Sequence, residues 1–329
     1  MSEKRNVALV AGGNSSESVI SVQSAAQMLK NIDSSKYNAW LVTVSGLQWK
    51  VQCLDGKMVE IDKNDFSFSV DDKKQFFDVV LMAIHGNPGE DGFLQAYFKM
   101  LNIPVTTCDM FVSALTFNKF ACKTFLKEFD IKTAKAKIYR QSDEIDFKQL
   151  VFELGLPVFV KPNNGGSSFG ASKVKRVEDF EVAFKKAFEH DHEIIAEEFI
   201  QATEVTCGVS ILNGVEYLLP PTEIVSKNEF FDYEAKYSEG KSEEITPARL
   251  APAQISEVQQ LSLKIYKLLN CKGVVRIDYL LRDGIFYFME VNSVPGMSAS
   301  SIVPKQLATY GISFSDFLGL LIEDAIQRK

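Results

Sequence analysis

The chain has 329 residues, which is more than one ordinary hydrophobic core holds, so we expect two or three domains. Its net charge of −7 argues against a nucleic-acid partner held by charge, and small anionic ligands would need local basic groups. The composition is that of a globular protein, and no apolar run reaches the roughly 18 residues of a membrane-spanning helix, so we expect no membrane partner.

The cysteine pattern and the first residues indicate the cellular compartment of the protein. Five cysteines are scattered through the chain, without a CxxC pair or a Cys/His zinc spacing. This pattern is typical of a protein in a reducing compartment. The first residues lead directly into an apolar run, so we expect no signal peptide and a cytoplasmic protein.

The chain opens with the pattern of an α/β domain. Residues 6–10 are apolar and β-prone, a glycine-rich turn follows, residues 21–29 have helical periodicity, and residues 38–44 indicate a second strand. The turn lacks both the GxGxxG spacing of a dinucleotide fold and the Lys-Ser/Thr pair of a P-loop. Glu17 lies in this turn, where it either stabilises the helix dipole or binds a substrate ammonium group.

The rest of the first domain leads to a conspicuous loop. Residues 47–75 are short, polar and β-like segments, and residues 77–84 form a continuous apolar run typical of a buried parallel strand. That run ends at His85, and ligands of open α/β sheets bind beyond the carboxyl ends of strands. A lone loop histidine is nevertheless more often a structural hydrogen-bonding group. A helix at residues 93–101 and a short strand at residues 104–105 complete the domain.

A second glycine-rich loop follows further along the chain. Residues 157–162 and 171–177 predict two antiparallel strands, and a loop rich in glycine and serine joins them. The free N–H groups of such a loop can face phosphate oxygens, and Lys161 adds a positive charge just before it. A glycine-rich loop alone is weak evidence, because many hairpins have one.

Charged residues also occur inside regular elements of the middle region. Residues 114–129 predict one helix that carries Lys119 and Lys123, although lysines on helices are usually only solvated. Glu197 and Glu198 are neighbours inside a strand. Because adjacent strand residues face opposite ways, one of these acids must face inward and needs a partner.

The last third of the chain predicts strands, a lid and two helices. Residues 204–212 and 216–219 indicate strands, and residues 255–269 a strongly amphipathic helix. Residues 228–242 are charged and aromatic without clear periodicity, as in a functional lid or a disordered loop. Residues 314–327 predict a closing helix.

A β-hairpin is predicted by the apolar runs on either side of Asp283-Gly284. A two-residue loop pairs Arg282 with Ile285 and separates the nearby acids onto opposite faces. A three-residue loop, with Gly284 left-handed, pairs Leu281 with Ile285 and brings those acids onto one face. We adopt the three-residue loop.

In that register one face of the hairpin is polar and carries Arg276, Asp278, Glu290 and Asn292. The other face would be apolar, with Ile277, Tyr279, Leu281, Tyr287, Met289 and Val291. Two carboxylates and an amide oxygen suit Mg²⁺, and an arginine beside them suits a developing anion. The alternative is a solvated face with surface ion pairs.

Seven segments, in this order, together resemble one family. They are GGNSSES, HGNPGEDG, NKFACKTFL, VKPNNGGSSFG, FDYEAKY, CKGVVRIDYL and MEVNSVPGMSASSIVP. The chain resembles the D-alanine–D-alanine ligases of the ATP-grasp superfamily from about residue 6 to 325. The resemblance implies an α/β protein of three domains: an N-terminal parallel α/β domain at residues 1–113 and two α+β domains, at residues 114–204 and 205–329, that grip ATP.

The resemblance also implies a reaction. ATP phosphorylates the carboxylate of one D-alanine, the amine of a second D-alanine attacks the acylphosphate, and loss of phosphate gives the dipeptide for peptidoglycan. It implies a homodimer built through the first domain.

The resemblance carries over to residues that would bind ATP. These are Lys119, Lys161, Glu197, Glu198, Phe199, Ile200, Glu204 and Lys236. Lys119 and Lys161 would contact the α- and β-phosphates, and Lys236, on the lid, the γ-phosphate. Glu197 would accept from the adenine amine and Glu204 from the ribose hydroxyls, while the other contacts to adenine are largely through backbone atoms. Many bacterial relatives carry lysine at the position of Glu198 and charged residues in the glycine loop, so we expect a change in affinity and not in identity.

The carry-over also covers metal, substrate and catalytic residues. Two Mg²⁺ (or Mn²⁺) ions would be held by Asp278, Glu290 and Asn292. His85, Ser301 and Ile302 would line the D-alanine subsites. The catalytic residues would be Glu17, Ser167, Tyr237, Arg276, Gly296 and Ser301. Glu17 would hold the first ammonium group, with Ser167 and Tyr237 bonded into its network, and Arg276 with the Gly296 N–H would form the oxyanion site.

Two alternatives stay open. One is an ATP-grasp ligase with another acceptor, such as D-lactate or D-serine. Ligases that make D-alanyl-D-lactate have a different lid, in which histidine takes the role that Tyr237 would have in this chain, so the FDYEAKY segment favours an amine acceptor. The other is a non-catalytic ATP-binding regulator, which the presence of Asp278 and Glu290 disfavours.

Overall fold

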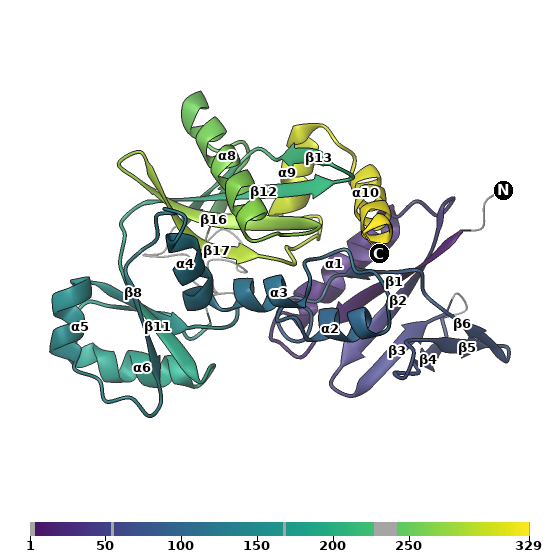
Figure 1. Cartoon of the computed structure of the whole chain (residues 1–329), viewed down its shortest axis with the longest axis horizontal. Helices are drawn as coiled ribbons and strands as arrows, with labels where there is room; N and C mark the ends of the chain where they lie inside the picture. The colour runs from purple at the N-terminus through teal and green to yellow at the C-terminus, as the bar shows by residue number, and fades with distance from the viewer. Residues whose placement is uncertain (1–3, 54–55, 167–168, 227–241, 329) are drawn as a thin grey trace.

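The computed structural model describes residues 4–53, 56–166, 169–226 and 242–328. Figure 1 shows three sheets, one after another along the chain, with helices packed on their faces. The lid predicted at residues 228–242, with Lys236 and Tyr237, lies outside the described residues except for its last residue, and so does Ser167.

The first sheet has the strand order β4-β3-β2-β1-β7. Its strands are β1 (Arg5–Gly12), β2 (Tyr37–Ser45), β3 (Gln48–Gln52), β4 (Met58–Glu60) and β7 (Val79–Met82). β1 pairs in parallel with β2 and β7, whereas β3 pairs antiparallel with both β2 and β4, so the predicted parallel sheet is in fact mixed. β5 (Phe68–Val70) and β6 (Lys73–Gln75) form a separate two-stranded sheet.

Both faces of the first sheet are covered, which explains the continuous apolar runs of β1 and β7. On one face, Val7 and Leu9 pack with residues of α1 (Ser18–Asn31) and α10 (Phe314–Gln327). On the other face, Ala8 and Val10 pack with α2 (Phe93–Met100). The C-terminal helix α10 therefore lies against the first sheet, as Figure 1 shows.

Two short helices replace the single helix predicted at residues 114–129. They are α3 (Met110–Phe117) and α4 (Lys119–Lys127). Asn118 has an extended backbone and its side chain accepts from the Ala121 N–H at 2.9 Å, so it caps α4 and breaks the helix. As a result α4 runs between the second sheet and the third (Figure 1). Its residues Lys119 and Lys123 line the space between them.

The second sheet is antiparallel, with the order β10-β9-β11-β8. Its strands are β8 (Ala136–Arg140), β9 (Val158–Pro162), β10 (Ser172–Val174) and β11 (Glu193–Glu198). α5 (Phe147–Leu154) and α6 (Phe180–Phe188), preceded by the 3-10 turn η1 (Val177–Asp179), cover one face. The sequence predicted β9, β10 and β11 but assigned nothing to β8 and α5.

The third sheet has the order β15-β14-β12-β16-β17, with β13 paired to β12. Its strands are β12 (Thr203–Leu212), β13 (Val215–Leu218), β14 (Thr222–Ser226), β15 (Ser242–Ile245), β16 (Val274–Arg282) and β17 (Ile285–Asn292). α8 (Pro252–Leu268) packs on β12. α9 (Ile302–Tyr310) was not predicted, and β14 and β15 were missed.

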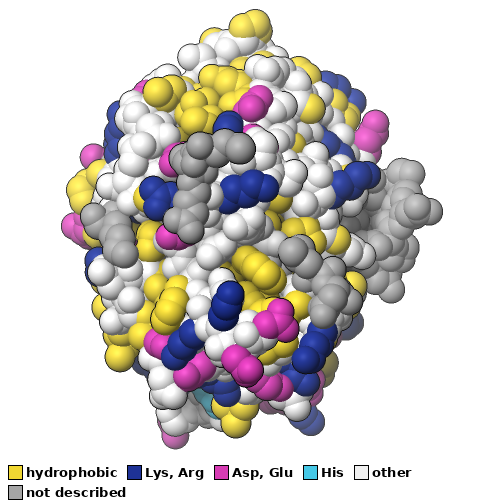
Figure 2. Space-filling view, turned by 90° about the vertical axis from the view of Figure 1, so that its right-hand side faces the viewer, with side chains coloured by type: hydrophobic (Ala, Val, Ile, Leu, Met, Phe, Trp, Pro, Cys, Tyr) yellow, Lys and Arg dark blue, Asp and Glu magenta, His cyan; other side chains and the backbone are white. Residues whose placement is uncertain are grey.

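The surface mixes charges of both signs. On the face drawn in Figure 2, lysine and arginine side chains lie among acidic and hydrophobic ones and form no patch of a single sign. Within the part of the chain that the structure describes, every helix falls short of the length and apolarity that a membrane crossing needs.

Candidate active site

A cleft of about 950 Å³ opens where the three sheets meet. The predicted site residues that line it come from all three: Glu17, Lys119, Lys161, Glu197, Glu198, Phe199, Ile200, Glu204 and Glu290. Asp278, Arg276 and Asn292 lie beside Glu290 on the hairpin. The chain therefore gathers residues from Glu17 to Asn292 into one site.

The hairpin turn differs from the prediction. Arg282 pairs with Ile285, and the turn is the two-residue loop Asp283-Gly284, in which both residues have positive φ, at 52° and 77°. This is the geometry of a type I′ turn. The predicted three-residue loop is therefore wrong.

The predicted polar face is nevertheless correct. Arg276 pairs with Asn292 and Asp278 with Glu290, because the register shifts by one residue between Asp278 and Tyr279. A β-bulge adds one residue to one strand and so restores the parity that the shorter turn would have changed. The turn sets the register near the loop, and the bulge sets it at the site.

The two-residue turn changes which aromatic residues fill the core, because it sets the register between the loop and the bulge. Phe286 and Phe288 are buried in the cluster beneath the third sheet, whereas Tyr287 and Met289 line the cleft. The predicted placement of Tyr287 and Met289 on the apolar face is therefore wrong. Downstream of the bulge, Val291 is in the core as predicted.

The polar residues of the hairpin bind one another. Arg276 donates from Nε and Nη2 to the two oxygens of Asp278, each at 3.0 Å, and Asn292 Nδ2 donates to Asp278 Oδ2 at 3.0 Å. Thr206 on the neighbouring strand also donates to Asp278. Burial acts to lower the pKa of Arg276, but the negative charges of Asp278 and Glu290 outweigh it and raise that pKa, so the guanidinium stays charged.

Lys119 joins three parts of the cleft. Its ammonium group lies 3.3 Å from Glu290 Oε2 and also donates to the carbonyl oxygen of Gly165. Lys119 is the first residue of α4, Gly165 belongs to the glycine-rich loop and Glu290 to β17. A cation at this position can contact an anionic ligand that lies between the loop and the hairpin.

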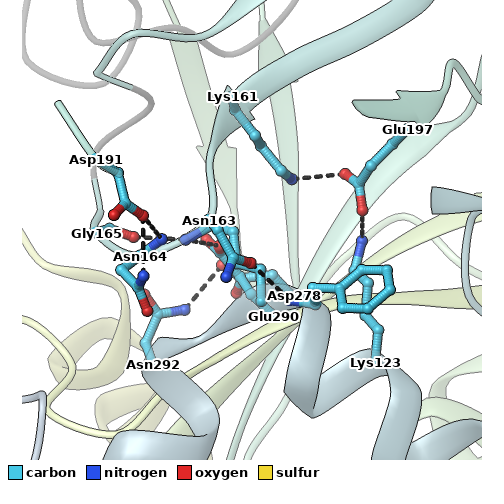
Figure 3. Close-up of polar contacts among 12 residues, drawn as sticks. Lys123, Lys161, Asn163, Asn164, Gly165, Asp191, Glu197, Asp278, Glu290 and Asn292 are labelled. Carbon is cyan, nitrogen blue, oxygen red and sulfur yellow. Dashed lines mark hydrogen bonds and ion pairs between the residues drawn. The ribbon is translucent and has the colours of Figure 1, made fainter. Parts of the chain in front are cut away.

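Glu197 is the inward-facing acid that the strand pattern required. Figure 3 shows Lys123 and Lys161 each reaching one of its two oxygens. Lys161 Nζ lies 2.7 Å from Oε2, and Lys123 pairs with Oε1. Burial would raise the pKa of Glu197, but the two ammonium groups hold it down to about 2, so the carboxylate is ionised. Its neighbour Glu198 accepts from the Lys135 N–H at 2.8 Å on the other side of the strand.

Lys123 was missed by sequence reasoning, which indicated a solvated helix lysine. It is only 2% exposed. The signal that could have found it is its spacing: Lys119 and Lys123 are four residues apart, and such residues share one face of a helix.

The glycine-rich loop comes close to Glu17. A side chain on Gly166 would place its Cβ 2.7 Å from Glu17 Oε2, so a larger residue there would displace the Glu17 carboxylate. Asn164 anchors the same loop by donating from its backbone N–H and its side chain to Asp191, at 2.7 and 2.9 Å. The glycine-rich loop with Gly166 and the turn with Glu17 are thus in contact. A site that binds an ammonium group with residues of both segments requires this contact.

A second residue that sequence reasoning missed is Glu90. It accepts from the Gly86 N–H at 3.0 Å and from the Val294 N–H at 3.3 Å. His85 Nδ1 lies 2.8 Å from the Val294 carbonyl oxygen, so this nitrogen carries the hydrogen and donates. The loop after β7 therefore holds the Val294 peptide from both sides. The acid-rich segment HGNPGEDG at a strand end was the available signal.

Burial changes the charge of both residues that hold Val294. It lowers the pKa of His85, which keeps the ring neutral. Burial and the nearby Glu17 raise the pKa of Glu90 to about 7. Ser24 Oγ lies 3.4 Å from His85 Nε2 and accepts from the Met297 N–H at 3.1 Å, so it joins the ring to the segment that follows Val294.

The predicted residues beyond the hairpin also lie together. A side chain on Gly296 would place its Cβ 2.8 Å from Ser301 Oγ, so the two residues are in contact. Ser301 Oγ lies 2.7 Å from Ser298 Oγ and accepts from the Ser298 N–H at 3.1 Å. Ser301 is the N-cap residue of α9, and Ile302 is the first residue of that helix.

The hairpin residues fit a hard divalent cation by their chemistry. Among the described residues, no group of three or more His, Cys, Asp and Glu side chains is arranged to hold a metal. Asp278 and Glu290 are direct cross-strand partners, and Asn292 adds an amide oxygen next to them. Two carboxylates and an amide supply only oxygen ligands, which Mg²⁺ prefers, and Mg²⁺ usually completes its shell with water and phosphate oxygens.

Two family models match the chain. The model described as "D-ala D-ala ligase N-terminus" matches residues 6–108, and the one described as "D-ala D-ala ligase C-terminus" matches residues 125–323. Among curated proteins, the D-alanine–D-alanine ligase of Phocaeicola vulgatus is 46% identical, over 98% of this chain and 99% of the relative. That of Parabacteroides distasonis is 45% identical, over 99% of both chains.

Solved structures of ligases are also similar to this chain. The VanG D-Ala:D-Ser ligase from Enterococcus faecalis matches with a TM-score of 0.88 at 30% identity, over 97% of this chain and 98% of that one. The D-alanine–D-alanine ligase from Bacillus anthracis complexed with ATP matches with a TM-score of 0.79 at 31% identity, over 99% of this chain and 98% of that one.

Proposed function

The chain belongs to the D-alanine–D-alanine ligase family of ATP-grasp enzymes, and from this premise we propose how its residues join two D-alanines at the expense of ATP. It is a D-alanine–D-alanine ligase and serves peptidoglycan synthesis. The observation that carries the assignment of residues is the single cleft in which cations, acids and glycine-rich loops of all three sheets meet.

ATP binds in the cleft between the second and third sheets. Lys119 and Lys161 contact the α- and β-phosphates, and their ion-pair partners, Glu290 and Glu197, place both ammonium groups on the cleft wall. Glu197 accepts from the adenine amine. The segment after it, Glu198, Phe199 and Ile200, lines the cleft and contacts the base. Glu204 accepts from the ribose hydroxyls, and Lys236 reaches the γ-phosphate.

Asp278, Glu290 and Asn292 would hold two Mg²⁺ or Mn²⁺ ions. When bound, such ions neutralise negative charge on the phosphates during phosphoryl transfer. The support in this chain is the register of the hairpin, which places the three oxygen-bearing side chains on one face.

The first D-alanine binds next to Glu17, which accepts from its ammonium group, with Ser167 and Tyr237 joined to Glu17 and His85 nearby. Phosphoryl transfer from ATP to the carboxylate gives an acylphosphate. The amine of the second D-alanine, held by Ser301 and Ile302, then attacks the carbonyl carbon, and a C–N bond and an oxyanion form. Collapse of this intermediate breaks the C–O bond to phosphate, which leaves, and the new amide nitrogen loses a proton.

Arg276 and the Gly296 N–H stabilise the oxyanion. The charge of Arg276 is fixed by Asp278, so the guanidinium remains a donor throughout turnover. The segment that carries Gly296 is held from the first domain, since His85 and Glu90 bind the Val294 peptide two residues earlier. Removal of one such donor costs on the order of 10²- to 10³-fold in rate in other enzymes.

We further propose the setting in which this chemistry takes place. The chain divides into units at residues 1–113, 114–204 and 205–329, and one sheet falls largely in each. The enzyme is cytoplasmic and forms a homodimer through the first unit. Sedimentation of the purified protein tests the dimer, and a species of 36.8 kDa at micromolar concentration would contradict it.

The acceptor is tested by ADP release with Mg²⁺-ATP and one amino acid at a time. We expect turnover with D-alanine alone, second order in D-alanine at low concentration, with the dipeptide seen by mass spectrometry. The similarity to a D-Ala:D-Ser ligase makes D-serine the second candidate. Turnover that requires D-serine or D-lactate beside D-alanine would overturn the amine-acceptor assignment of Tyr237.

A further inference from the structure

Lys123 is a buried cation that none of the roles above uses. It lies one turn after Lys119 on α4, its side chain is 3% exposed, and it lines the cleft. Burial of an ammonium group is costly unless the group is paired, and burial lowers the pKa of Lys123. Its ammonium group pairs with Glu197, the residue to which we assign the adenine amine.

The two lysines of Glu197 are not equivalent. Lys161 binds Oε2, and its side chain, at 12% exposure, is the more open of the two. It also feels the charges of Glu290 and Glu204, which lie towards the proposed phosphate and ribose sites. A phosphate contact from Lys161 takes its ammonium group away from Glu197 or divides it between the two. Lys123, on Oε1, is the cation that remains with Glu197.

We propose that Lys123 determines the choice of nucleobase by keeping Glu197 ionised and oriented, so that the cleft takes a 6-aminopurine nucleotide and rejects a 6-oxopurine nucleotide. This inference rests on the proposed role of Glu197. Lys123 is thus a positioning residue, and it reaches the base only through that carboxylate.

The selection between the two bases follows from the hydrogen bonding of a carboxylate. An ionised Glu197 can only accept hydrogen bonds, so it pairs with the amino group of adenine and faces the oxygen of a 6-oxopurine without a hydrogen between them. A protonated Glu197 could donate to that oxygen. Without Lys123, burial would favour the protonated form, and the distinction between the two bases would weaken.

The test compares ATP with inosine triphosphate, which carries an oxygen in place of the 6-amino group. Binding of each nucleotide is measured by calorimetry, and kcat/KM for each is measured with D-alanine. We expect the wild-type protein to prefer ATP by on the order of 100-fold, and Lys123→Met to reduce this preference by roughly tenfold or more. Contacts to the rest of the base are the same in wild type and in Lys123→Met. They therefore cancel when the preference for ATP of one protein is divided by that of the other.

Two matched variants separate selection from folding. Lys127 is exposed one turn further along α4, so Lys127→Met should keep the wild-type preference. Lys123→Arg retains the charge and should keep most of it. If Lys123→Met does not fold, Glu197→Gln provides the same readout, because an amide can present either a donor or an acceptor to the base.

An unchanged preference for ATP in Lys123→Met, or in Glu197→Gln, would overturn the inference, as would an equal loss of affinity for both nucleotides. The binding measurement needs no amino acid. Wild-type protein that binds ATP but releases no ADP with D-alanine would therefore contradict the proposed function while the binding ratio still tests Lys123.

Discussion

Two acids near the cleft, Glu197 and Glu90, have pKa values that are shifted in opposite directions. Glu197 is 5% exposed, and two ammonium groups hold its pKa down to about 2. Glu90 is partly buried, binds two backbone N–H groups and has Glu17 nearby, and its pKa is raised to about 7. The more deeply buried acid is the stronger one, so the charged partners outweigh burial in setting the pKa.

The difference between the two pKa values follows from the partners that surround each acid. Glu197 lies on a strand beneath α4, where lysines on a helix and on the adjacent strand can reach it and pair with it. Glu90 joins the loop after β7 to the segment that carries Gly296, and backbone N–H groups are the partners such a junction offers. Glu197 is therefore held by charged partners that keep it ionised, whereas Glu90 is held by backbone hydrogen bonds.

Removal of Glu197 should have the largest effect on stability. Glu197→Leu leaves two buried ammonium groups without their counter-ion, and breaking a buried ion pair from one side costs about 3–5 kcal/mol of the free energy of unfolding. Urea unfolding measures this loss. Glu198→Leu, the neighbouring residue on the opposite face of β11, is the control and should change stability by less than about 1 kcal/mol.

A double variant sharpens this prediction. Glu197→Leu combined with Lys123→Met removes one of the stranded charges, so it should be more stable than Glu197→Leu alone. If Glu197→Leu is as stable as the Glu198→Leu control, the ion pairs of Glu197 do not carry the stability assigned to them.

The raised pKa of Glu90 predicts a pH dependence of stability. Between its usual pKa of 4.5 and the folded value of about 7, the folded protein binds the proton that the unfolded chain has released, so stability falls as the pH rises through this range. The shift corresponds to at most about 3 kcal/mol. For Glu197 the sign is opposite: its contribution is present above 4.5 and is lost as the pH falls towards 2.

Glu90→Gln tests this window, because the neutral amide has no proton to lose. We expect the stability of wild type relative to Glu90→Gln to fall between about pH 4.5 and 7.5, as measured by urea unfolding across that range. The exposed Glu257→Gln on α8 serves as control. A difference between wild type and Glu90→Gln that does not vary with pH would mean that Glu90 is ionised in both states.

The smallest expected effect concerns the junction that Glu90 helps to hold. Ser24→Ala removes the acceptor of the buried Met297 N–H and the contact to His85, which should cost about 1–2 kcal/mol. Thermal and urea unfolding measure it, with the exposed Gln23→Ala on the same helix as control. Equal stability of the two variants would show that the Met297 N–H has another acceptor.

Sequence reasoning found most of the fold where side-chain periodicity is strong. α10 was predicted at its observed bounds, and β1 and β7 were recognised because both faces of their sheet are covered. The break at Asn118 was missed, since an N-cap residue inside an apolar pattern gives no periodicity signal. β8 and α5 were missed because they are short, with five and eight residues.

The sequence indicated which residues belong to the candidate site better than it indicated which of them are in contact. Strand alternation required a partner for Glu197, but only the fold shows that the partners are Lys123 and Lys161, from different elements. The polar face of the hairpin was predicted from the wrong turn, and it holds because a bulge that no local pattern indicates restores the register. Glu90 depends on a contact between residues about 200 positions apart.

The assignment of the hairpin acids is tested most directly by the rate of ADP release from Mg²⁺-ATP and D-alanine in wild type and in Glu290→Gln. The variant keeps the size of the side chain but removes one of the two carboxylates. We expect it to fold, with the same urea transition as wild type within about 1 kcal/mol, and to lose on the order of 100-fold or more in turnover. Wild-type turnover in a folded Glu290→Gln protein would contradict the role of this hairpin in ligation.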